Sequence, residues 1–390
     1  MNRRRMLRQL GLSAFCLTCG SSATNGSAAA LIDAISADET HAGQPREKSN
    51  YHLAEFSGTA RDCGRAYGSS QAEAIGVFLH HELQPDILRL DYAERCGKVL
   101  EEWEKPVFEF VQGMAEGSGR SLQETVLVLL HEEICHVHTC TGIGATGKGT
   151  ADGSAVIGQN WDWGSSLYPW SSLLRLRSDS MPATLTYAYP GLWAAAGMNE
   201  HGLSLVWTSS GLYPAFPCDV GVPTYALIAG IFTRRTCREA ITLLEKTRNA
   251  GAFIFFLADA TGDVWVVEGL PGKVQPTQCV DVIARANHFE SEEMRRLSKQ
   301  DVPPKLNANS FSRAGRMASL AKAHYGQITG ELVATFLSDH GVAPGLNICQ
   351  HPARPGDGFT LDSFYLLPAK RQMWIARGLP CRHSYEKFTV

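Results

Sequence analysis

The chain has 390 residues, of which 44% are hydrophobic, so it can bury one large core or two of average size. A formal charge of −3, and the lack of a basic patch interleaved with aromatic residues, argue against a nucleic-acid partner. No apolar run reaches the roughly 18 residues that a membrane span requires, so we expect no membrane span.

Residues 1–30 have the pattern of a twin-arginine signal peptide. Arginines at 3–5 precede a short apolar segment at 10–17, and small residues at 27–30 offer a cleavage site for a signal peptidase. A disordered basic tail is the alternative interpretation. We expect a periplasmic or secreted protein, in which the polar residues 31–50 form a linker.

Residues 51–139 are expected to form a mainly helical N-terminal segment. Apolar residues at helical spacing predict helices over about 56–90, 101–116 and 122–133. Gly64 and Gly68 lie in the first of these helices, where they would allow a neighbouring element to approach closely. Residues 121–124 have the form of a capping box, which fixes the start of the third helix.

The pattern changes to short strands from residue 139 onward. A hairpin over 139–145 and 155–160 turns at 151–154. Further strands are predicted over 173–177, 184–188, 192–197, 203–208, 252–258, 264–268, 364–368 and 372–376, and further helices over 225–232, 238–248, 312–323 and 328–338. Hairpins outnumber β-α-β crossovers, which favours antiparallel sheets covered by helices.

Cys140 lies at the start of the first hairpin, between small polar residues, and the carboxylate of Asp162 follows 22 positions later. One interpretation is a nucleophile that becomes a chain terminus. The alternative is a buried structural thiol, because free cysteine is among the most buried residue types. A lone cysteine does not decide between the two.

Five short motifs together resemble the acyl-coenzyme A:6-aminopenicillanic-acid acyltransferase family, which is isopenicillin-N N-acyltransferase-like and belongs to the N-terminal-nucleophile cysteine hydrolases. They are Cys-Thr at 140–141, Gly-Gln-Asn-Trp-Asp-Trp at 158–163, Gly-Met-Asn-Glu-His-Gly-Leu at 197–203, Ala-Asn-His-Phe at 286–289 and Ser-Arg-Ala-Gly-Arg at 312–316. The resemblance runs from about Ala54 to the C-terminus. It implies an α+β fold, the four-layer αββα sandwich, with residues 140–390 as the catalytic core.

The resemblance also implies self-cleavage between Thr139 and Cys140. A thiol with a reference pKa near 8.5 needs activation, and the new α-amine, with a reference pKa of about 7.7–8.0, can act as its general base. The resemblance assigns the orientation of that amine to the carboxylate of Asp162, for which a turn or cap aspartate is the alternative. The fragments 51–139 and 140–390 would then stay associated.

Two further residues match functional positions of the family. Asn287 matches the side-chain donor to the oxyanion, and Arg313 matches an arginine near the nucleophile that lowers the thiol pKa and orients the substrate. The alternatives are an ordinary loop asparagine and a solvated arginine on a helix.

The chain departs from the pattern at two places. Thr139 replaces the glycine that usually precedes the nucleophile, and its β-branched side chain would slow self-cleavage or alter its strain. Thr208 and Ser209 lie where bile-salt hydrolases often have asparagine, so bile-acid specificity is not expected.

A rival site lies just upstream, where His131, Glu132, Cys135, His136 and His138 are close in sequence. His131 and Cys135 have the i, i+4 spacing of a helical metal pair, but the pattern is not His-Glu-x-x-His. Histidines packed near a cleavage site are more often structural. We therefore expect no metal and no cofactor.

The remaining cysteines of the mature chain are scattered, at Cys63, Cys96, Cys135, Cys218, Cys237, Cys279, Cys349 and Cys381. Their even number allows disulfides in an exported protein, although the sequence assigns no pairing. They contain no Cys-x-x-Cys pair, so a zinc ribbon is not expected.

The sequence therefore predicts an exported, self-processing cysteine amidohydrolase that cleaves an N-acyl amide through a thioester on Cys140. Its partner would be a small-molecule acyl amide or thioester, and Trp161, Trp163, Trp170 and Trp193 are candidates to line an acyl pocket. One alternative is an acyl-coenzyme-A-dependent N-acyltransferase of a β-lactam or amine acceptor. Another is a catalytically silent binding protein with the same fold, against which the presence of all four candidate catalytic residues argues.

Overall fold

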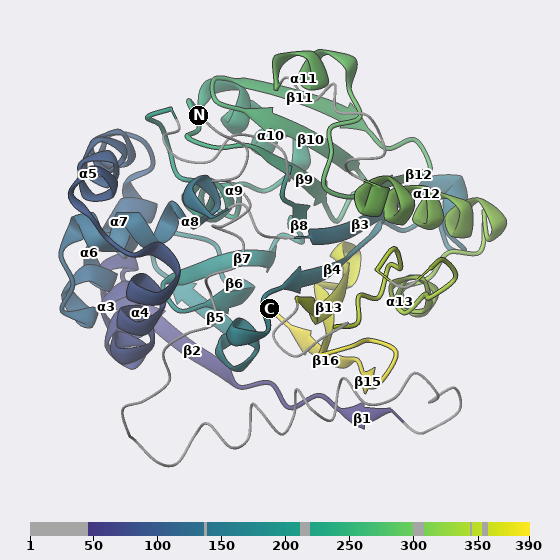
Figure 1. Ribbon diagram of the computed structural model, residues 1–390, viewed down its shortest axis with the longest axis horizontal. Helices are drawn as coiled ribbons and strands as arrows, with labels where there is room; N and C mark the ends of the chain where they lie inside the picture. The colour runs from purple at the N-terminus through teal and green to yellow at the C-terminus, as the bar shows by residue number, and fades with distance from the viewer. Residues whose placement is uncertain (1–45, 136–138, 211–218, 299–307, 344, 353–357) are drawn as a thin grey trace, which may run out of the picture.

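The computed structural model describes residues 46–135, 139–210, 219–298, 308–343, 345–352 and 358–390. In these ranges two large β-sheets face each other, and helices cover the outer side of each (Figure 1). This is the expected four-layer αββα sandwich. None of the helices in the described ranges has the length and apolar character of a membrane-crossing segment.

The larger sheet has eight strands within the described chain. In spatial order they are β11 (Lys273–Gln278), β10 (Val264–Leu270), β9 (Phe253–Ala258), β8 (Ser204–Thr208), β7 (Leu192–Asn199), β6 (Thr184–Tyr189), β5 (Ser172–Ser178) and β2 (Leu53–Gly58). All neighbours are antiparallel except the edge strand β2, which pairs parallel to β5. The N-terminal segment therefore contributes a strand to the core.

The smaller sheet has six strands in the described part of the chain, and all its neighbours are antiparallel. In spatial order they are β12 (Val282–Arg285), β3 (Thr139–Ala145), β4 (Val156–Trp163), β13 (Phe359–Leu367), β14 (Gln372–Arg377) and β16 (Glu386–Thr389). The predicted hairpin at 139–160 is confirmed as β3 and β4. These two strands pack against β8 and β9 of the larger sheet.

Helices form the two outer layers. Against the larger sheet lie α9 (Thr224–Ile231), which contacts β7, and α10 (Cys237–Lys246), which contacts β10 and β11. Against the smaller sheet lie α12 (Ala308–Ala323), which contacts β3 and β12, and α13 (Gly330–Leu337), which contacts β4 and β13. A short helix, α11 (Glu292–Leu297), precedes α12.

The predicted helical segment forms a cluster beside α9 (Figure 1). It consists of α3 (Ala60–Ser70), α4 (Ala72–Phe78), a π-helical turn (Leu79–Leu83), α5 (Ile87–Glu101), α6 (Lys105–Ser118), α7 (Leu122–Leu129) and α8 (His131–Ile134). The capping box is confirmed at Ser121 and Glu124. The helix predicted over 101–116 was placed too early, because Pro106 lies in the first turn of α6, where its missing N–H costs nothing.

Two predictions for the start of the chain need correction. Residues 53–58 form β2, so the helical pattern predicted from residue 56 begins too early. The last residues of the linker expected over 31–50 are part of the folded structure. β1 (Glu47–Lys48) pairs with β15 (His383–Ser384), and the Ser49 hydroxyl donates to the Ser384 carbonyl oxygen at 2.6 Å. These residues anchor the N-terminal segment to the C-terminal tail, whereas residues 31–45 lie outside the described ranges.

Glycines bring α3 and α6 into close contact, as the sequence indicated. A Cβ placed on Gly64 would lie 2.1 Å from the Phe110 carbonyl oxygen, and one on Gly113 would lie 2.0 Å from the Arg61 carbonyl oxygen. Real Cβ atoms do not approach other atoms so closely, so only glycine fits both positions at this separation.

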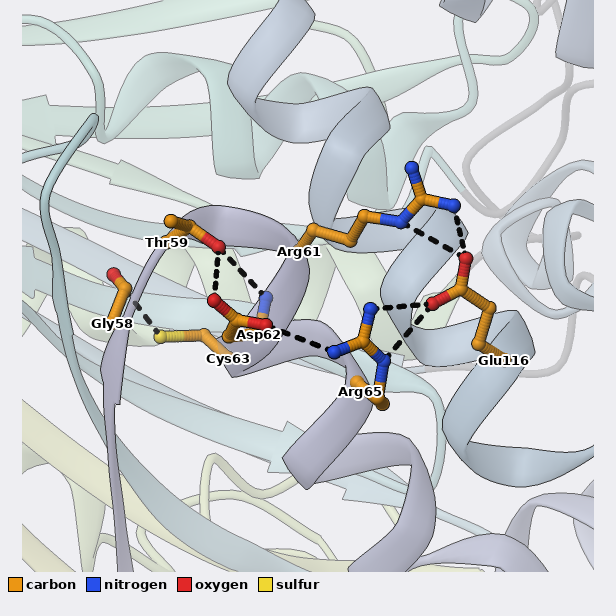
Figure 2. A network of polar contacts seen from close by, with 7 residues as sticks. All are labelled: Gly58, Thr59, Arg61, Asp62, Cys63, Arg65 and Glu116. Carbon is orange, nitrogen blue, oxygen red and sulfur yellow. Dashed lines mark hydrogen bonds and ion pairs between the residues drawn. The ribbon is translucent and has the colours of Figure 1, made fainter.

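Polar contacts join the same two helices at the surface (Figure 2). Thr59 caps α3 by accepting from the Asp62 N–H, and Arg61 and Arg65 both donate to the carboxylate of Glu116 on α6. Because these charged groups are half-exposed, their ion pairs add little to stability, and the buried glycine contact determines the packing.

A matched pair of glycine substitutions tests this packing. Gly113→Ala should lower the free energy of unfolding by about 1–3 kcal/mol, because the new methyl group collides with the α3 backbone. Gly315→Ala, in the exposed face of α12 with no atom near the added Cβ, should raise it by about 0.4–1 kcal/mol. Urea denaturation of both variants measures the difference, and equal effects at the two sites would contradict the close-packing argument.

Candidate active site

The pairing of β3 with β4 determines on which face of the smaller sheet the predicted nucleophile lies. Cys140 pairs with Trp161, and Thr139 pairs with Asp162. Side chains of a strand alternate between its faces, so Cys140 shares the inner face of the sheet with Trp161, while Asp162 and Thr139 share the outer face. Cys140 is 2% exposed, whereas Thr139 is exposed. The predicted cleavage bond therefore lies where the chain passes from the surface into the core.

Arg313 connects α12 to this strand. Its side chain is fully buried and donates to the Cys140 carbonyl oxygen, to the Thr141 hydroxyl at 2.8 Å and to the Asn287 side-chain oxygen at 2.7 Å. A fourth hydrogen bond, to the side-chain oxygen of Asn309 at 2.8 Å, fixes the guanidinium on its own helix. The alternative of a solvated surface arginine is excluded.

Asn287 follows β12 and lies beside Cys140. Its side-chain oxygen accepts from the backbone N–H of Cys140 at 2.9 Å, and its amide group donates to the Ser209 carbonyl oxygen at 2.9 Å. Because Arg313 also needs an acceptor at this position, the network fixes the orientation of the amide. In the uncleaved chain Asn287 thus holds the nitrogen of Cys140, and its expected role as an oxyanion donor stays a prediction.

Asp162 is buried beside the Thr139–Cys140 peptide bond. One carboxylate oxygen accepts from the Thr360 hydroxyl at 2.6 Å, while the other has no hydrogen-bond partner among the described residues. Burial raises the pKa of Asp162 to about 7, although the charge of Arg313 and the Thr360 hydrogen bond lower it. A buried acceptor is therefore available beside the predicted cleavage site.

The thiol itself is protonated at neutral pH in this uncleaved state. Burial raises the pKa of Cys140 to about 12, and the charge of Asp162 adds to the rise. The backbone N–H of Asp162, the charge of Arg313 and the Gln159 side chain act in the opposite direction. Activation of the thiol thus requires a base close to it.

Gln159 and Trp207 are site residues to which the sequence analysis gave no role. The Gln159 side-chain oxygen accepts from the Trp207 backbone N–H at 2.7 Å, which fixes the amide group, and its buried NH₂ has no hydrogen-bond partner among the described residues. Gln159 belongs to the Gly-Gln-Asn-Trp-Asp-Trp motif at 158–163, so its membership of that motif was the sequence signal that could have identified it as a site residue. Trp207 stands in no quoted motif.

The hollow beside the Cys140 side chain is lined by Cys140, Trp161, Trp207 and Ser209. Of the four tryptophans proposed for an acyl pocket, only Trp161 lines it. Trp163 packs its ring against His131, and Trp193 stacks on Phe110 with ring centroids 4.5 Å apart; Trp170 ends a short 3₁₀ turn before β5.

The rival metal site is not assembled by the residues that the structure describes. His131 packs its ring between those of Phe78 and Trp163, with centroids 5.2 and 4.8 Å away. Glu132 is buried, and burial raises its pKa well above the ordinary value. His136 and His138 lie outside the described residues. The structure favours the packing role of His131.

Comparison with known proteins agrees with the motifs. A sequence model of the acyl-coenzyme A:6-aminopenicillanic acid acyl-transferase family matches residues 149–380, which is more than half of the chain. The chain belongs to this family. The match contains Asp162, Asn287 and Arg313 and begins nine residues after Cys140. The family is named for an acyltransferase.

Solved structures with a distant likeness include a single-substitution variant, arginine to leucine, of conjugated bile acid hydrolase from Clostridium perfringens. It has 15% sequence identity and a TM-score of 0.42, and the match covers 64% of this chain and 97% of that one. Penicillin V acylase from Agrobacterium tumefaciens has 18% identity and a TM-score of 0.40, with 61% and 83% covered. Likeness at this level assigns no substrate to the family member described here.

The raised pKa of Asp162 predicts a pH-dependent stability. Its pKa is about 7 in the folded chain and 3.8 ordinarily, so the folded state binds the proton more tightly. The stabilisation is fully present below about pH 4 and is lost as the pH rises to about 7, at up to about 1.4 kcal/mol per pH unit.

The measurement compares Cys140→Ala with Cys140→Ala/Asp162→Asn, since both chains lack the thiol expected to cut the chain and their other titrating groups are shared. Urea denaturation between pH 4 and 8 should show the Asp162 chain losing stability relative to the Asn variant. A difference that stays constant over this range would mean that Asp162 titrates as an ordinary carboxyl group.

Proposed function

We propose that the chain cuts its own Thr139–Cys140 bond and that Cys140 then hydrolyses an N-acyl amide through a thioester. The observation that carries the proposal is the convergence of Arg313, Asn287 and Asp162 on the two residues at the start of β3. Three motifs that are far apart in sequence supply these three groups, and each lies within the family resemblance.

The first step would be self-cleavage. The thiol sulfur attacks the Thr139 carbonyl carbon, the bond from that carbon to the Cys140 nitrogen breaks, and the nitrogen takes up a proton. Water then hydrolyses the resulting thioester, which frees the Thr139 carboxylate and restores the thiol. The exposed Thr139 and the buried, hydrogen-bonded Cys140 support this step, because the nucleophile is held while the chain before it reaches solvent.

The new α-amine of Cys140 would act as general base for its own thiol. The buried oxygen of Asp162 that lacks a partner among the described residues lies beside the bond that releases this amine, so it is placed to accept a hydrogen bond from it. The amide of Gln159 would donate to the thiolate that forms, because Gln159 shares the inner face of the sheet with Cys140 and its NH₂ has no partner among the described residues.

Asn287 and Arg313 would stabilise and orient the acyl group. The Asn287 amide carries two hydrogens, one of which goes to Ser209, so the second remains for an oxyanion. Removing one such donor typically costs about 2.7–4 kcal/mol of transition-state stabilisation. Arg313 holds the carbonyl group of Cys140, which keeps the nucleophile in place.

Acyl transfer to an amine is the second candidate, because the matched family is named for an acyltransferase. Water is the favoured acceptor if the protein is exported, since acyl-coenzyme A is scarce outside the cytoplasm. Export is inferred from the twin-arginine pattern alone. Incubation with an N-acyl amide in water, and with an acyl-coenzyme A plus 6-aminopenicillanic acid, separates the two reactions.

Self-cleavage gives the first prediction on function. The wild-type protein should yield a piece spanning residues 140–390, of about 27 kDa by length out of 42.5 kDa, with Cys140 as its first residue. Cys140→Ala should remain one chain, and the control Cys279→Ala should be processed normally. Intact-mass spectrometry and N-terminal sequencing measure this.

An active preparation that stays full-length would overturn the proposal. Thr139→Gly provides a finer test of the same step, because it introduces the glycine that usually precedes the nucleophile in the family. Its cleavage should be at least as fast as that of the wild type, since the branched side chain beside the attacked carbonyl is removed.

The second prediction concerns the orientation of the amine. Asp162→Asn should keep the fold and lower kcat/KM by about 10²–10⁴-fold, because the amine loses its charged partner. Asp179→Asn, at an exposed position, serves as the control and should be unaffected. Turnover is measured on matured protein, with the extent of cleavage determined on the same sample. Near-normal turnover of a folded Asp162→Asn chain would show that another group holds the amine.

A further inference from the structure

Four metal-ligating side chains meet beside the end of the smaller sheet where Thr360 pairs with Asp162. They are His340, Cys349, His351 and Cys381, whose ligand atoms all lie within 4.8 Å of one another. His340 follows α13, the pair at 349–351 lies between α13 and β13, and Cys381 follows β14. Among the residues that the structure describes, this is the one such group of three or more.

Three of the six distances within the group are close to the edges of a zinc-centred tetrahedron, and none of the six exceeds 4.8 Å. The sulfur atoms of Cys349 and Cys381 are 3.8 Å apart, Nε2 of His340 and Nε2 of His351 are 3.0 Å apart, and the Cys381 sulfur lies 3.3 Å from Nε2 of His351. A zinc ion with bonds of about 2.3 Å to sulfur and about 2.0–2.1 Å to nitrogen requires edges of about 3.8 Å, 3.4 Å and 3.5 Å respectively.

We propose that this group binds one zinc ion with Cys₂His₂ coordination. Two thiolates and two imidazoles are a donor set that zinc prefers, and they supply all four tetrahedral positions. The site would therefore be structural, because no coordination position is left for a substrate or for water. Two protonated thiols would lose their protons on binding, so the two thiolate charges balance the charge of the ion.

The ligands are held in place by their surroundings. Cys349 is fully buried, and its backbone N–H donates to the Asp339 carbonyl oxygen at 3.2 Å. The Asp339 carboxylate in turn accepts two hydrogen bonds from Arg316 of α12, at 2.8 and 2.7 Å. The segment that carries His340 is thus joined both to Cys349 and to the outer helical layer. Such prior positioning lowers the entropic cost of assembling the site.

The site also contacts the segment that positions Asp162. Gln350 lies between the two ligands of one segment, and its N–H donates to the Thr360 hydroxyl at 2.9 Å. That hydroxyl donates to the Asp162 carboxylate at 2.6 Å. A bound zinc ion would therefore restrain the segment that orients Thr360, without itself touching the reacting atoms.

A disulfide between Cys349 and Cys381 is the competing possibility. A disulfide requires sulfur atoms about 2.05 Å apart, and the cysteines in the described ranges are all free. It would also leave the two histidines in mutual contact without a function. The zinc site accounts for all four residues.

The test measures zinc in the full chain, purified without a polyhistidine tag. Wild type should contain about one zinc per chain by plasma mass spectrometry, and His340→Asn and Cys381→Ser should each lose at least about 90% of it. The controls His52→Asn and Cys279→Ser, which lie outside the group, should keep it. His340 is exposed, so its variant should fold, and circular dichroism checks this.

Cobalt provides a readout that does not depend on activity. After removal of zinc with a chelator, one equivalent of cobalt should give the intense visible bands of a tetrahedral site and a thiolate charge-transfer band, both absent in Cys381→Ser. Wild type that holds no zinc, takes none up and shows a Cys349–Cys381 disulfide in peptide mapping would overturn the proposal. Equal zinc in wild type and in both ligand variants would also overturn it.

Discussion

The buried guanidinium of Arg313 is the interaction on which the site depends. A buried charge is costly unless it is paired and hydrogen-bonded, and each of the three nitrogens of Arg313 donates a hydrogen bond, to β3, to the end of β12 or to its own helix. These contacts fix the outer helical layer to the strand of the nucleophile. Asp162, whose pKa is raised to about 7, supplies the opposing charge when it is ionised, so these two buried groups set the electrostatics around Cys140 together.

Contacts between the two sheets explain how the two fragments of a cleaved chain would stay associated. β2, which precedes the predicted cleavage site, is an edge strand of the larger sheet, and β1 pairs with β15 near the C-terminus. The helices α3 to α8 add buried apolar contacts to the same side. Separating the fragments would expose these strand edges and apolar faces together, which supports the expected association of residues 51–139 with residues 140–390.

Most elements of the chain could be predicted because their signals are local. Alternation and turn residues identified β3, β4, β9, β10 and β14, and the capping box identified the start of α7. β2, β11, β12 and β16 were missed, because partly exposed edge strands lack a clear apolar pattern and form only against a neighbour. The motif resemblance placed Arg313 near Cys140, and the structure shows the two in contact, although an arginine in a helix ordinarily faces water.

By itself the sequence determined the family, the αββα architecture and the residues that meet at β3, because motifs in a fixed order carry that information. Only the tertiary structure decided which tryptophans line the hollow, how Asn287 is oriented and where Gln159 points. It also joined His340 to Cys381, which are 41 positions apart and form no recognised spacing. Side chains brought together by chain crossings leave no periodic signal in the sequence, so their proximity can be read only from the folded chain.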